Sequence, residues 1–266
     1  MWHQLTKDQS RGDVWRGMQA LDLFSGIGGM SLGLREWVTT VAYCESDEFC
    51  RGVLFKRMED GMLPPGPICE DARAIDGREL RGHIDIIIAG FPYQGGSAAG
   101  NGDCMAGEHD SLFVEVPRLV EEIEPAYVFV EGNASLRSHG LETLVASLSE
   151  RGYDCRWQNI RASDAGAPHS RQRCYILAHA LGERKARHKT GARTRWPAFD
   201  VRTQQAGWDE WPRGETGLCG ADDGVPGELY RAARLRALGS AVVPQQAALA
   251  FAMALGIAVP FDNGHN

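Results

Sequence analysis

The chain has 266 residues, of which 43% are hydrophobic and 24% charged, and its formal net charge is −7. This length suits one large domain, and the composition is that of a folded globular protein, which excludes the disordered and fibrous classes. Taken alone, the negative net charge argues against a polyanionic partner such as nucleic acid.

The charge is, however, unevenly distributed along the chain. Residues 151–200 carry eleven Lys and Arg against four acids, a net charge of +7, and the remaining residues carry −14. A basic segment on an acidic body can still steer a polyanion toward one face. The same pattern also describes a solvated arginine-rich loop, so the charge by itself leaves both interpretations open.

No secretory signal, membrane span or metal site is predicted. The first residues lack an apolar core, and the apolar stretch 247–261 is shorter than the ~20 residues of a span and contains Pro260. The seven cysteines show neither a CxxC pair nor zinc-like spacing. We therefore expect a cytoplasmic protein with reduced thiols.

The first predicted elements are a strand, a glycine turn and a helix. The segment QALDLFSGIGGMSLGLREW from Gln19 begins with an apolar run, continues through glycines, and then has helical apolar spacing. Further strands are expected at residues 40–44, 67–69 and 84–89. The last is a continuous aliphatic run, which is typical of a strand buried on both faces of a parallel sheet.

Helices and strands continue to alternate in the middle of the chain. We expect helices at 111–122 and 141–150, and strands at 127–130, 153–159 and 174–178. This order predicts an α/β fold with a Rossmann-like, doubly wound, mostly parallel sheet that binds ligands at the carboxyl ends of its strands. Polar or special residues stand at those predicted ends: Ser25, Glu45, Asp71, Pro92 and Glu131.

Residues 181–225 interrupt the alternation. They hold a basic run, three tryptophans and several Gly and Pro, with no clear helix or strand period, which indicates an insertion or a small second domain. Regular spacing returns near Leu229 as two helical pieces joined at GSAVVP. We expect a main domain at 1–180, the irregular region at 181–228, and C-terminal helices at 229–266 that return to the main domain.

The glycine turn admits three interpretations. Glycines after a strand, followed by Glu45 about twenty residues on, suit a nicotinamide dinucleotide, but the third glycine of that fingerprint falls on Ser31. The same layout suits an adenosyl ligand without a pyrophosphate, whose ribose the acid would bind. A plain strand-to-helix turn fits equally well, so the turn alone does not decide.

Four further motifs follow DLFSGIGG in a fixed order. They are GFPYQ at 90–94, VEGN at 130–133, SRQRCYILA at 170–178 and LGSAVVPQQA at 238–247. In this order they resemble the motifs of the DNA cytosine-5 methyltransferase family. The resemblance extends from about Ala20 to the C-terminal helix and leaves out residues 181–225. That insertion lies where the family places its target-recognition region.

The resemblance implies a set of site residues. S-adenosylmethionine would be bound by a group of residues from several motifs: Phe24, Ser25, Gly26, Gly28, Gly29, Glu45 on the ribose, Asp71 on the adenine amino group, Ala72 and Ser240. Glu131 would contact N3 of a flipped cytosine, and Arg171 and Arg173 would bind near its O2 edge. The implied partner is double-stranded DNA, bound by a monomer, and the implied source is a bacterium or a phage.

The family's nucleophilic cysteine is missing. Its PCQ motif reads Pro92-Tyr93-Gln94 here, and a phenol with a reference pKa of ~10 is a poor substitute for a thiolate. The same pocket also differs at Gly132, His169 and Ser240. The familiar C5 mechanism is therefore not expected from these residues.

Gly-Phe-Pro-Tyr at 90–93 is instead similar to the short aromatic motif of DNA amino-methyltransferases. In that motif a flipped base stacks on the ring while its exocyclic amine attacks the methyl group directly. We therefore predict methylation of cytosine at N4. The expected catalytic residues are Pro92, Tyr93, Glu131, Arg171 and Arg173.

Three other functions stay open. One is a catalytically silent relative that still binds cofactor and DNA, and another is C5 methylation with a different nucleophile, such as Cys104. A dinucleotide oxidoreductase is also conceivable, although it would leave the two arginines unexplained. The target DNA sequence cannot be read from the spacing, because base readout depends on which side chains reach the groove edges.

Overall fold

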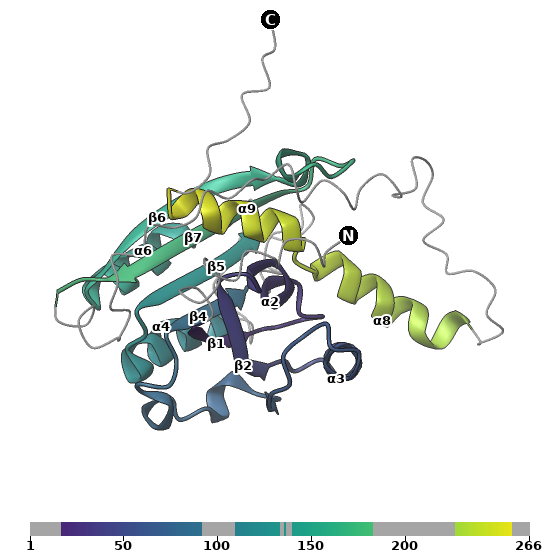
Figure 1. The fold of residues 1–266 in the computed structure, drawn as a ribbon, viewed down its shortest axis with the longest axis horizontal. Helices are drawn as coiled ribbons and strands as arrows, with labels where there is room; N and C mark the ends of the chain where they lie inside the picture. The colour runs from purple at the N-terminus through teal and green to yellow at the C-terminus, as the bar shows by residue number, and fades with distance from the viewer. Residues whose placement is uncertain (1–16, 92–109, 134–135, 137–139, 183–226, 257–266) are drawn as a thin grey trace, which may run out of the picture.

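The computed structural model describes residues 17–91, 110–133, 136, 140–182 and 227–256 (Figure 1). These residues form a seven-stranded sheet in the order β3-β2-β1-β4-β5-β7-β6. The strands are β1 (Met18–Leu23), β2 (Val38–Cys44), β3 (Ile68–Cys69), β4 (Ile86–Gly90), β5 (Tyr127–Asn133), β6 (Tyr153–Arg161) and β7 (Gln172–Ala180). β7 runs antiparallel to both its neighbours, and the other pairs are parallel. The Rossmann-like α/β prediction is confirmed.

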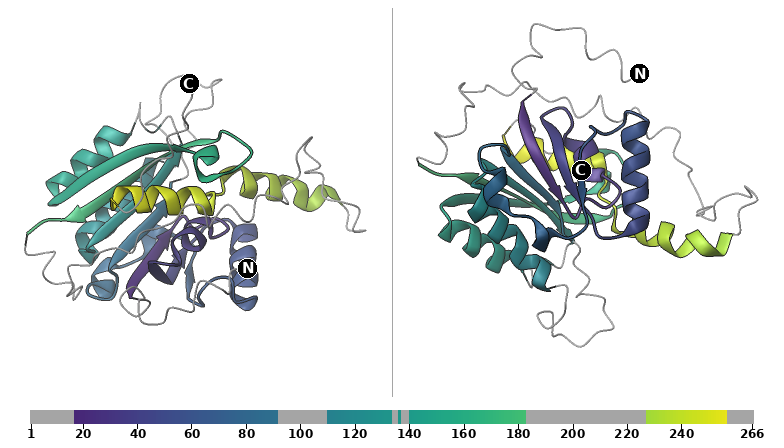
Figure 2. Two further views of the ribbon diagram at one scale, coloured as in Figure 1. Left: turned by 45° about the horizontal axis from the view of Figure 1, so that its top comes forward. Right: turned by 90° about the horizontal axis from the view of Figure 1, so that it is seen from below.

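Helices cover both faces of the sheet (Figures 1 and 2). On one face lie α2 (Gly29–Leu34) and α9 (Pro244–Ala254), and on the other lie α4 (Asp110–Ile123) and α6 (Leu141–Glu150). α3 (Glu48–Glu59) packs beside β2, and α8 (Gly227–Ser240) projects away from the sheet next to α3. Three short 3-10 helices complete the described part: η2 (Ala72–Ala74), η3 (Gly77–Leu80) and η4 (Ala162–Ala165).

The side chains of β4 show why the predicted aliphatic run forms a central strand. Ile86 and Ile88 point into the apolar cluster under α2 and α9, while Ile87 and Ala89 point into the cluster under α4 and α6. All four side chains are buried, because successive side chains of a strand face opposite sides of a sheet that is covered on both.

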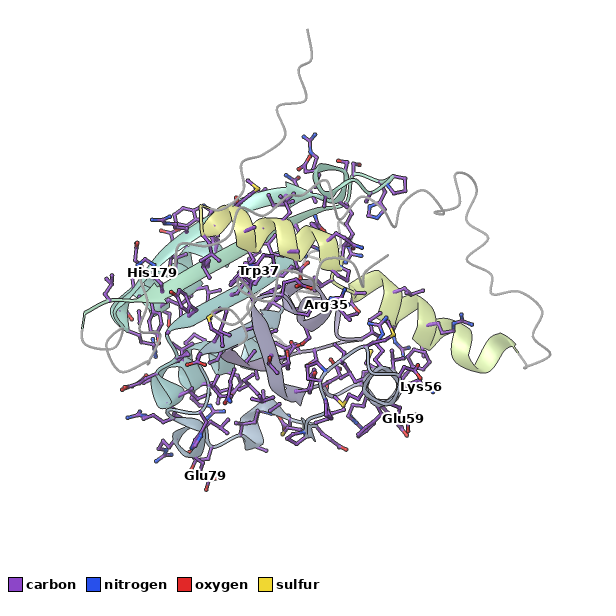
Figure 3. All side chains as sticks on the ribbon, in the orientation of Figure 1. Arg35, Trp37, Lys56, Glu59, Glu79 and His179 are labelled. Carbon is purple, nitrogen blue, oxygen red and sulfur yellow. The ribbon has the colours of Figure 1, made fainter. Side chains whose placement is uncertain are left out.

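α9 is a core helix. Residues 246–252 are all buried, and Phe251 packs against Trp37 and edge-to-face on Phe129 (Figure 3 labels Trp37 beneath α9). Among the described residues, one segment, Arg236–Ala254, has the length and composition of a membrane span. It is divided here between α8 and the sheet-packed α9.

α3 was not predicted from the sequence. It buries only Cys50 and Leu54, so it carries almost no apolar stripe. Its start is specified instead by Asp47, whose side chain accepts a hydrogen bond from the backbone N–H of Cys50. The two predicted C-terminal helices are both present, as α8 and α9, while most of the expected region 181–228 lies outside the described residues.

Candidate active site at the carboxyl ends of the strands

The turn between β1 and α2 has the tight backbone that its glycines predict. Phe24, Gly26 and Gly28 all have positive φ, at 55°, 54° and 81°. A Cβ on Gly28 would lie 2.6 Å from Leu63 Cδ1, so a side chain there would collide with the wall of the turn. A Cβ on Gly26 would meet nothing within 4 Å among the described atoms. The turn is therefore packed on one side and open at Gly26.

Glu45 is fixed against this turn. Its Oε2 accepts a hydrogen bond from the backbone N–H of Gly26 at 2.6 Å, and its Oε1 accepts one from the backbone N–H of Asp47 at 2.8 Å. The backbone N–H of Ser25 donates to the carbonyl of Cys44 at the end of β2. The structure thus brings together two motifs that are about twenty residues apart in the chain. Each carboxylate oxygen keeps a further lone pair for a ligand hydroxyl.

Asp71 and Ala72 follow the end of β3. Asp71 accepts bonds from the backbone N–H and the Nε of Arg73, which lower the pKa of its carboxyl. The carbonyl of Ala72 accepts a bond from Arg118 Nη2. Cys44 lies within electrostatic reach of both Glu45 and Asp71, and burial raises the pKa of its thiol. The predicted ribose and adenine residues therefore share one end of the sheet.

Ser240 has a different setting from the other predicted cofactor residues. It is the last residue of α8, its side chain is exposed, and its hydroxyl donates to the carbonyl of Arg236 in the same helix. The residues after it approach the turn closely instead. A Cβ on Gly29 would lie 2.3 Å from the carbonyl oxygen of Val242, and one on Gly33 would lie 2.4 Å from that of Pro244.

Glu131 and Arg173 form an ion pair across the antiparallel strands β5 and β7. Arg173 Nε lies 2.9 Å from Glu131 Oε1, and only 5% of the glutamate side chain is exposed. Burial raises the pKa of Glu131 to about 7, because the loss of water outweighs the opposing effect of Arg173 and Arg171. This carboxyl can therefore exist as an acid or as a carboxylate near neutral pH.

Arg171 stands immediately before β7. Its Nε and Nη2 are buried and have no hydrogen-bond partner among the described residues. Burial and the neighbouring Arg173 lower its pKa. Its backbone N–H donates to Nδ1 of His169, whose pKa is lowered by burial and by Arg171, which favours a neutral imidazole. Arginine donors without partners in a buried setting indicate a place for a ligand acceptor.

Phe24 and Phe91 lie between the two groups of residues. Their rings pack edge-to-face with centroids 5.9 Å apart, and the backbone N–H of Phe91 donates to the carbonyl of Glu131 at 2.7 Å. Gly90 lies against Val242 and the carbonyl of Phe24. The segment that leads into the predicted Pro92 and Tyr93 is thus placed between Glu131 and the glycine turn. Those two residues themselves lie outside the described residues.

Sequence reasoning missed one buried polar cluster under the turn. Asp22 of β1 is fully buried and accepts a short hydrogen bond from Ser31, whose hydroxyl also pairs with Thr40 at 2.8 Å. Burial, with a smaller contribution from Glu45, raises the pKa of Asp22 to about 7. The signal that could have found it is an acid in the middle of the apolar run ALDLF.

Comparisons with known proteins identify the family. The family model for C-5 cytosine-specific DNA methylases matches residues 18–215, about three quarters of the chain. Type II methyltransferase M.CviJI of Paramecium bursaria Chlorella virus IL3A is 36% identical over 162 residues, which are 60% of this chain and 42% of the relative. Type II methyltransferase M.HhaI of Haemophilus parahaemolyticus is 30% identical over 166 residues, which are 60% of this chain and 49% of the relative.

Solved structures have a similar fold. A prophage-encoded DNA modification methyltransferase of E. coli has a TM-score of 0.51 and 25% identity, and the match covers 62% of this chain and 47% of the other. DNMT2 of Spodoptera frugiperda, at 19% identity and a TM-score of 0.51, has a similar fold. This chain spans about half the length of these relatives. The chain belongs to the C-5 cytosine-specific DNA methylase family.

Proposed function

We propose that this chain is an S-adenosylmethionine-dependent methyltransferase that acts on a cytosine flipped out of duplex DNA and methylates it at N4. The observation that carries the proposal is the buried pair Glu131–Arg173, at the same sheet edge as the glycine turn and Glu45. A pocket that holds both a buried carboxyl and arginine donors can bind the polar edge of one base in one orientation.

S-adenosylmethionine is the cofactor of this family, and the residues present fit it. The open side of Gly26 leaves room for the methionine end, and the carboxylate of Glu45 is held where two ribose hydroxyls could donate to it. When bound, the cofactor supplies an electrophilic methyl group on a sulfonium. The chain's own part is to hold that ligand against the strand ends and to bring the base to it.

The polar edge of cytosine matches the residues on β5 and β7. Its O2 accepts hydrogen bonds, which the unpartnered Nε and Nη2 of Arg171 and the guanidinium of Arg173 could donate. The carboxyl group of Glu131 would form hydrogen bonds with the N3 and N4 positions of the cytosine. With a pKa of about 7, it can donate to N3 when protonated and accept a hydrogen from the N4 amine when ionised.

N4 as the target atom follows from Tyr93, because the residue at the nucleophile position has no thiol. In the proposed reaction the N4 amine would take the methyl group that the bound cofactor supplies, the electron pair of the broken bond would stay with the cofactor, and the amine would lose one proton. The carbonyl of Phe91 and the carboxylate of Glu131 would accept the amine hydrogens, and the ring of Tyr93 would stack on the base. No covalent adduct with the protein is needed.

The tyrosine at position 93, in place of a cysteine, also favours a second candidate function. A chain that keeps the cofactor turn and the Glu131–Arg173 pair but lacks the thiol could bind cofactor and DNA without transferring a methyl group. Such a protein would act by occupying its target sequence. In both functions we assign cofactor binding to residues 1–180, target recognition to 181–228 and DNA binding to a monomer, and the C-terminal helices of 229–266 return to the first of these segments. Methyl transfer by residues 1–180 belongs to the first function alone.

Nucleoside analysis tests the proposal. The protein is incubated with S-adenosylmethionine and mixed-sequence duplex DNA, the DNA is digested, and methylated nucleosides are identified by mass and retention. N4-methylcytosine is the expected product. 5-Methylcytosine would contradict the choice of target atom, and the absence of any product, with both ligands bound, would support the second candidate.

A further inference from the structure

Gln246 is a buried polar residue that the proposed chemistry does not use. It lies in the first turn of α9, no part of it is exposed, and its Nε2 donates two hydrogen bonds into the sheet. The acceptors are the carbonyl oxygens of Ile160 at 2.7 Å and Arg171 at 3.0 Å. Because both partners are carbonyls, only the amide nitrogen can face them, so the orientation of this amide is determined.

These two carbonyls lie at the two ends of the loop segment that connects β6 to β7. Ile160 pairs in register with Arg173, and the carbonyl of Arg171 also accepts the backbone N–H of Ala162. One side-chain amide therefore ties the end of β6 to the start of β7. The two arginines of the predicted base pocket lie here, Arg171 immediately before β7 and Arg173 near its start.

The segment that presents Gln246 is itself anchored on the cofactor side. Gly33 of α2 lies against the carbonyl of Pro244, and Gly29 lies against that of Val242, so closely that neither position has room for a Cβ. The segment 242–246 thus contacts the helix after the glycine turn with its backbone and reaches the pocket strand with one side chain.

We propose that Gln246 is a positioning residue that holds Arg171 and Arg173 at the base pocket from the C-terminal helix. It contacts neither ligand and acts through the backbone at the start of β7. This inference rests on the proposed function, because it assumes that the arginine pocket receives a base.

The structure supplies a matched control on the same helix and strand. Gln158 of β6 donates from its Nε2 to the carbonyl of Ala250, one turn further along α9, at 2.6 Å. It pairs in register with Tyr175, beyond the arginines. Gln246→Leu and Gln158→Leu each remove an amide link between α9 and the sheet, but only the first removes the link at the pocket.

The test measures two affinities for each protein. Binding of a fluorescent mixed-sequence duplex is titrated in the presence of S-adenosylhomocysteine, and S-adenosylhomocysteine binding is measured by calorimetry. We expect Gln246→Leu to lower the duplex affinity about tenfold and to change cofactor affinity less than about twofold. Gln158→Leu should leave both affinities within about twofold of the wild type.

Gln246→Glu gives a readout that loosened packing would not produce. A protonated carboxyl can donate to one of the two carbonyls, while a carboxylate cannot donate and would face carbonyl oxygens. The ratio of variant to wild-type duplex affinity should therefore fall as the pH rises from about 6 to about 8. Using the ratio removes the contributions of Glu131 and Asp22, which titrate in both proteins.

Two results would overturn the inference while leaving the proposed function intact: equal loss of duplex affinity in the Gln246 and Gln158 variants, or a parallel loss of cofactor affinity in Gln246→Leu. A pH-independent affinity ratio for Gln246→Glu would also contradict it, including in the case that Gln246→Leu does not fold. A wild-type chain that binds no duplex would instead overturn the proposed function, and the inference with it.

Discussion

Arg173 Nε lies 2.9 Å from Glu131 Oε1, and this ion pair joins β5 to the antiparallel strand β7. The pair lies at the side of the sheet where the parallel strands have their carboxyl ends. The pair combines a carboxyl that is almost completely buried with an arginine whose side chain is 20% exposed. Among the described residues, Arg173 is the ion-pair partner of this buried carboxyl. The stability of this region therefore depends on pH, because the ionised form of Glu131 needs the arginine and the protonated form does not.

Removal of Arg173 should therefore destabilise the chain more at high pH than at low pH. At about pH 6 Glu131 is mostly protonated and needs no cation. At about pH 8 the Glu131 of the variant must either ionise without Arg173 or keep its proton, and both cost free energy of folding. We expect Arg173→Met to lower the free energy of unfolding by roughly 1 kcal/mol at pH 6 and by roughly 3 kcal/mol at pH 8. Urea denaturation at both pH values measures this, and an equal loss at both would contradict the role assigned to the pair.

Asp22 should make folding less favourable as the pH rises. Its pKa in the folded chain, about 7, is above the ordinary value, so the folded state binds the extra proton between about pH 4 and pH 7 and the unfolded state does not. The associated stability is present at low pH and is lost as the pH rises through 7. Asp22→Asn, which keeps an oxygen for Ser31, should be more stable than the wild type by about 4 kcal/mol at pH 8.

A matched substitution at an exposed helix cap serves as the control. Asp76 accepts a hydrogen bond from the backbone N–H of Arg78 at the start of η3, and its side chain is half exposed. Because the fall in stability between about pH 4 and pH 7 is assigned to the buried Asp22, Asp76→Asn should leave that fall in place. If Asp22→Asn also shows that dependence, the buried aspartate does not titrate as its surroundings indicate.

Two glycine substitutions should have opposite effects on stability. Gly33→Ala would place a Cβ 2.4 Å from the carbonyl of Pro244, so α2 and α9 would have to separate, at a cost of roughly 1–3 kcal/mol. Gly52→Ala in α3 meets nothing within 4 Å and should stabilise that helix by about 0.5–1 kcal/mol. Thermal melting of the two variants checks both signs, and a neutral Gly33→Ala would mean that the two helices are not closely packed.

Neutralising an exposed arginine at the end of β6 should weaken DNA binding in a salt-dependent way. Arg161 is exposed at the carboxyl end of that strand, on the same edge as the pocket. If it contacts a phosphate, Arg161→Gln should reduce the slope of log affinity against log salt by about 1. Arg78 lies in η3, in the chain segment before β4, and Figure 3 labels its neighbour in that helix, Glu79. Arg78→Gln should leave the slope unchanged. Equal slopes for both variants would place the DNA elsewhere.

The sheet and its covering helices could be predicted from the sequence because their apolar patterns are strong. The run at 84–89 and the strand at Tyr127 appear where expected, and both are buried on two faces. The helix at 48–59 could not be predicted from periodicity, because its stability depends on a cap and two buried side chains. The antiparallel direction of β7 could not be predicted either, because the apolar pattern of a strand does not indicate its direction in the sheet.

Part of the candidate site could be predicted, and part could not. Glu45 and the glycine turn are connected by a regular strand-turn-helix unit, so their proximity follows from the fold. The contact of Gln246 with Arg171 joins residues 75 positions apart, and it depends on how α9 lies across the sheet. The hydroxyl of Ser240 donates within its own helix, which the motif alone does not indicate, and its role at the cofactor remains a prediction.

Nucleoside analysis of the wild type beside Tyr93→Cys tests the central claim most directly. Both proteins are incubated with S-adenosylmethionine and mixed-sequence duplex DNA, and the methylated cytosines are separated by retention and mass. We predict N4-methylcytosine from the wild type and, because a thiolate can then add to C6, some 5-methylcytosine from Tyr93→Cys. 5-Methylcytosine from the wild type, or no product from either protein when both ligands bind, would contradict this account.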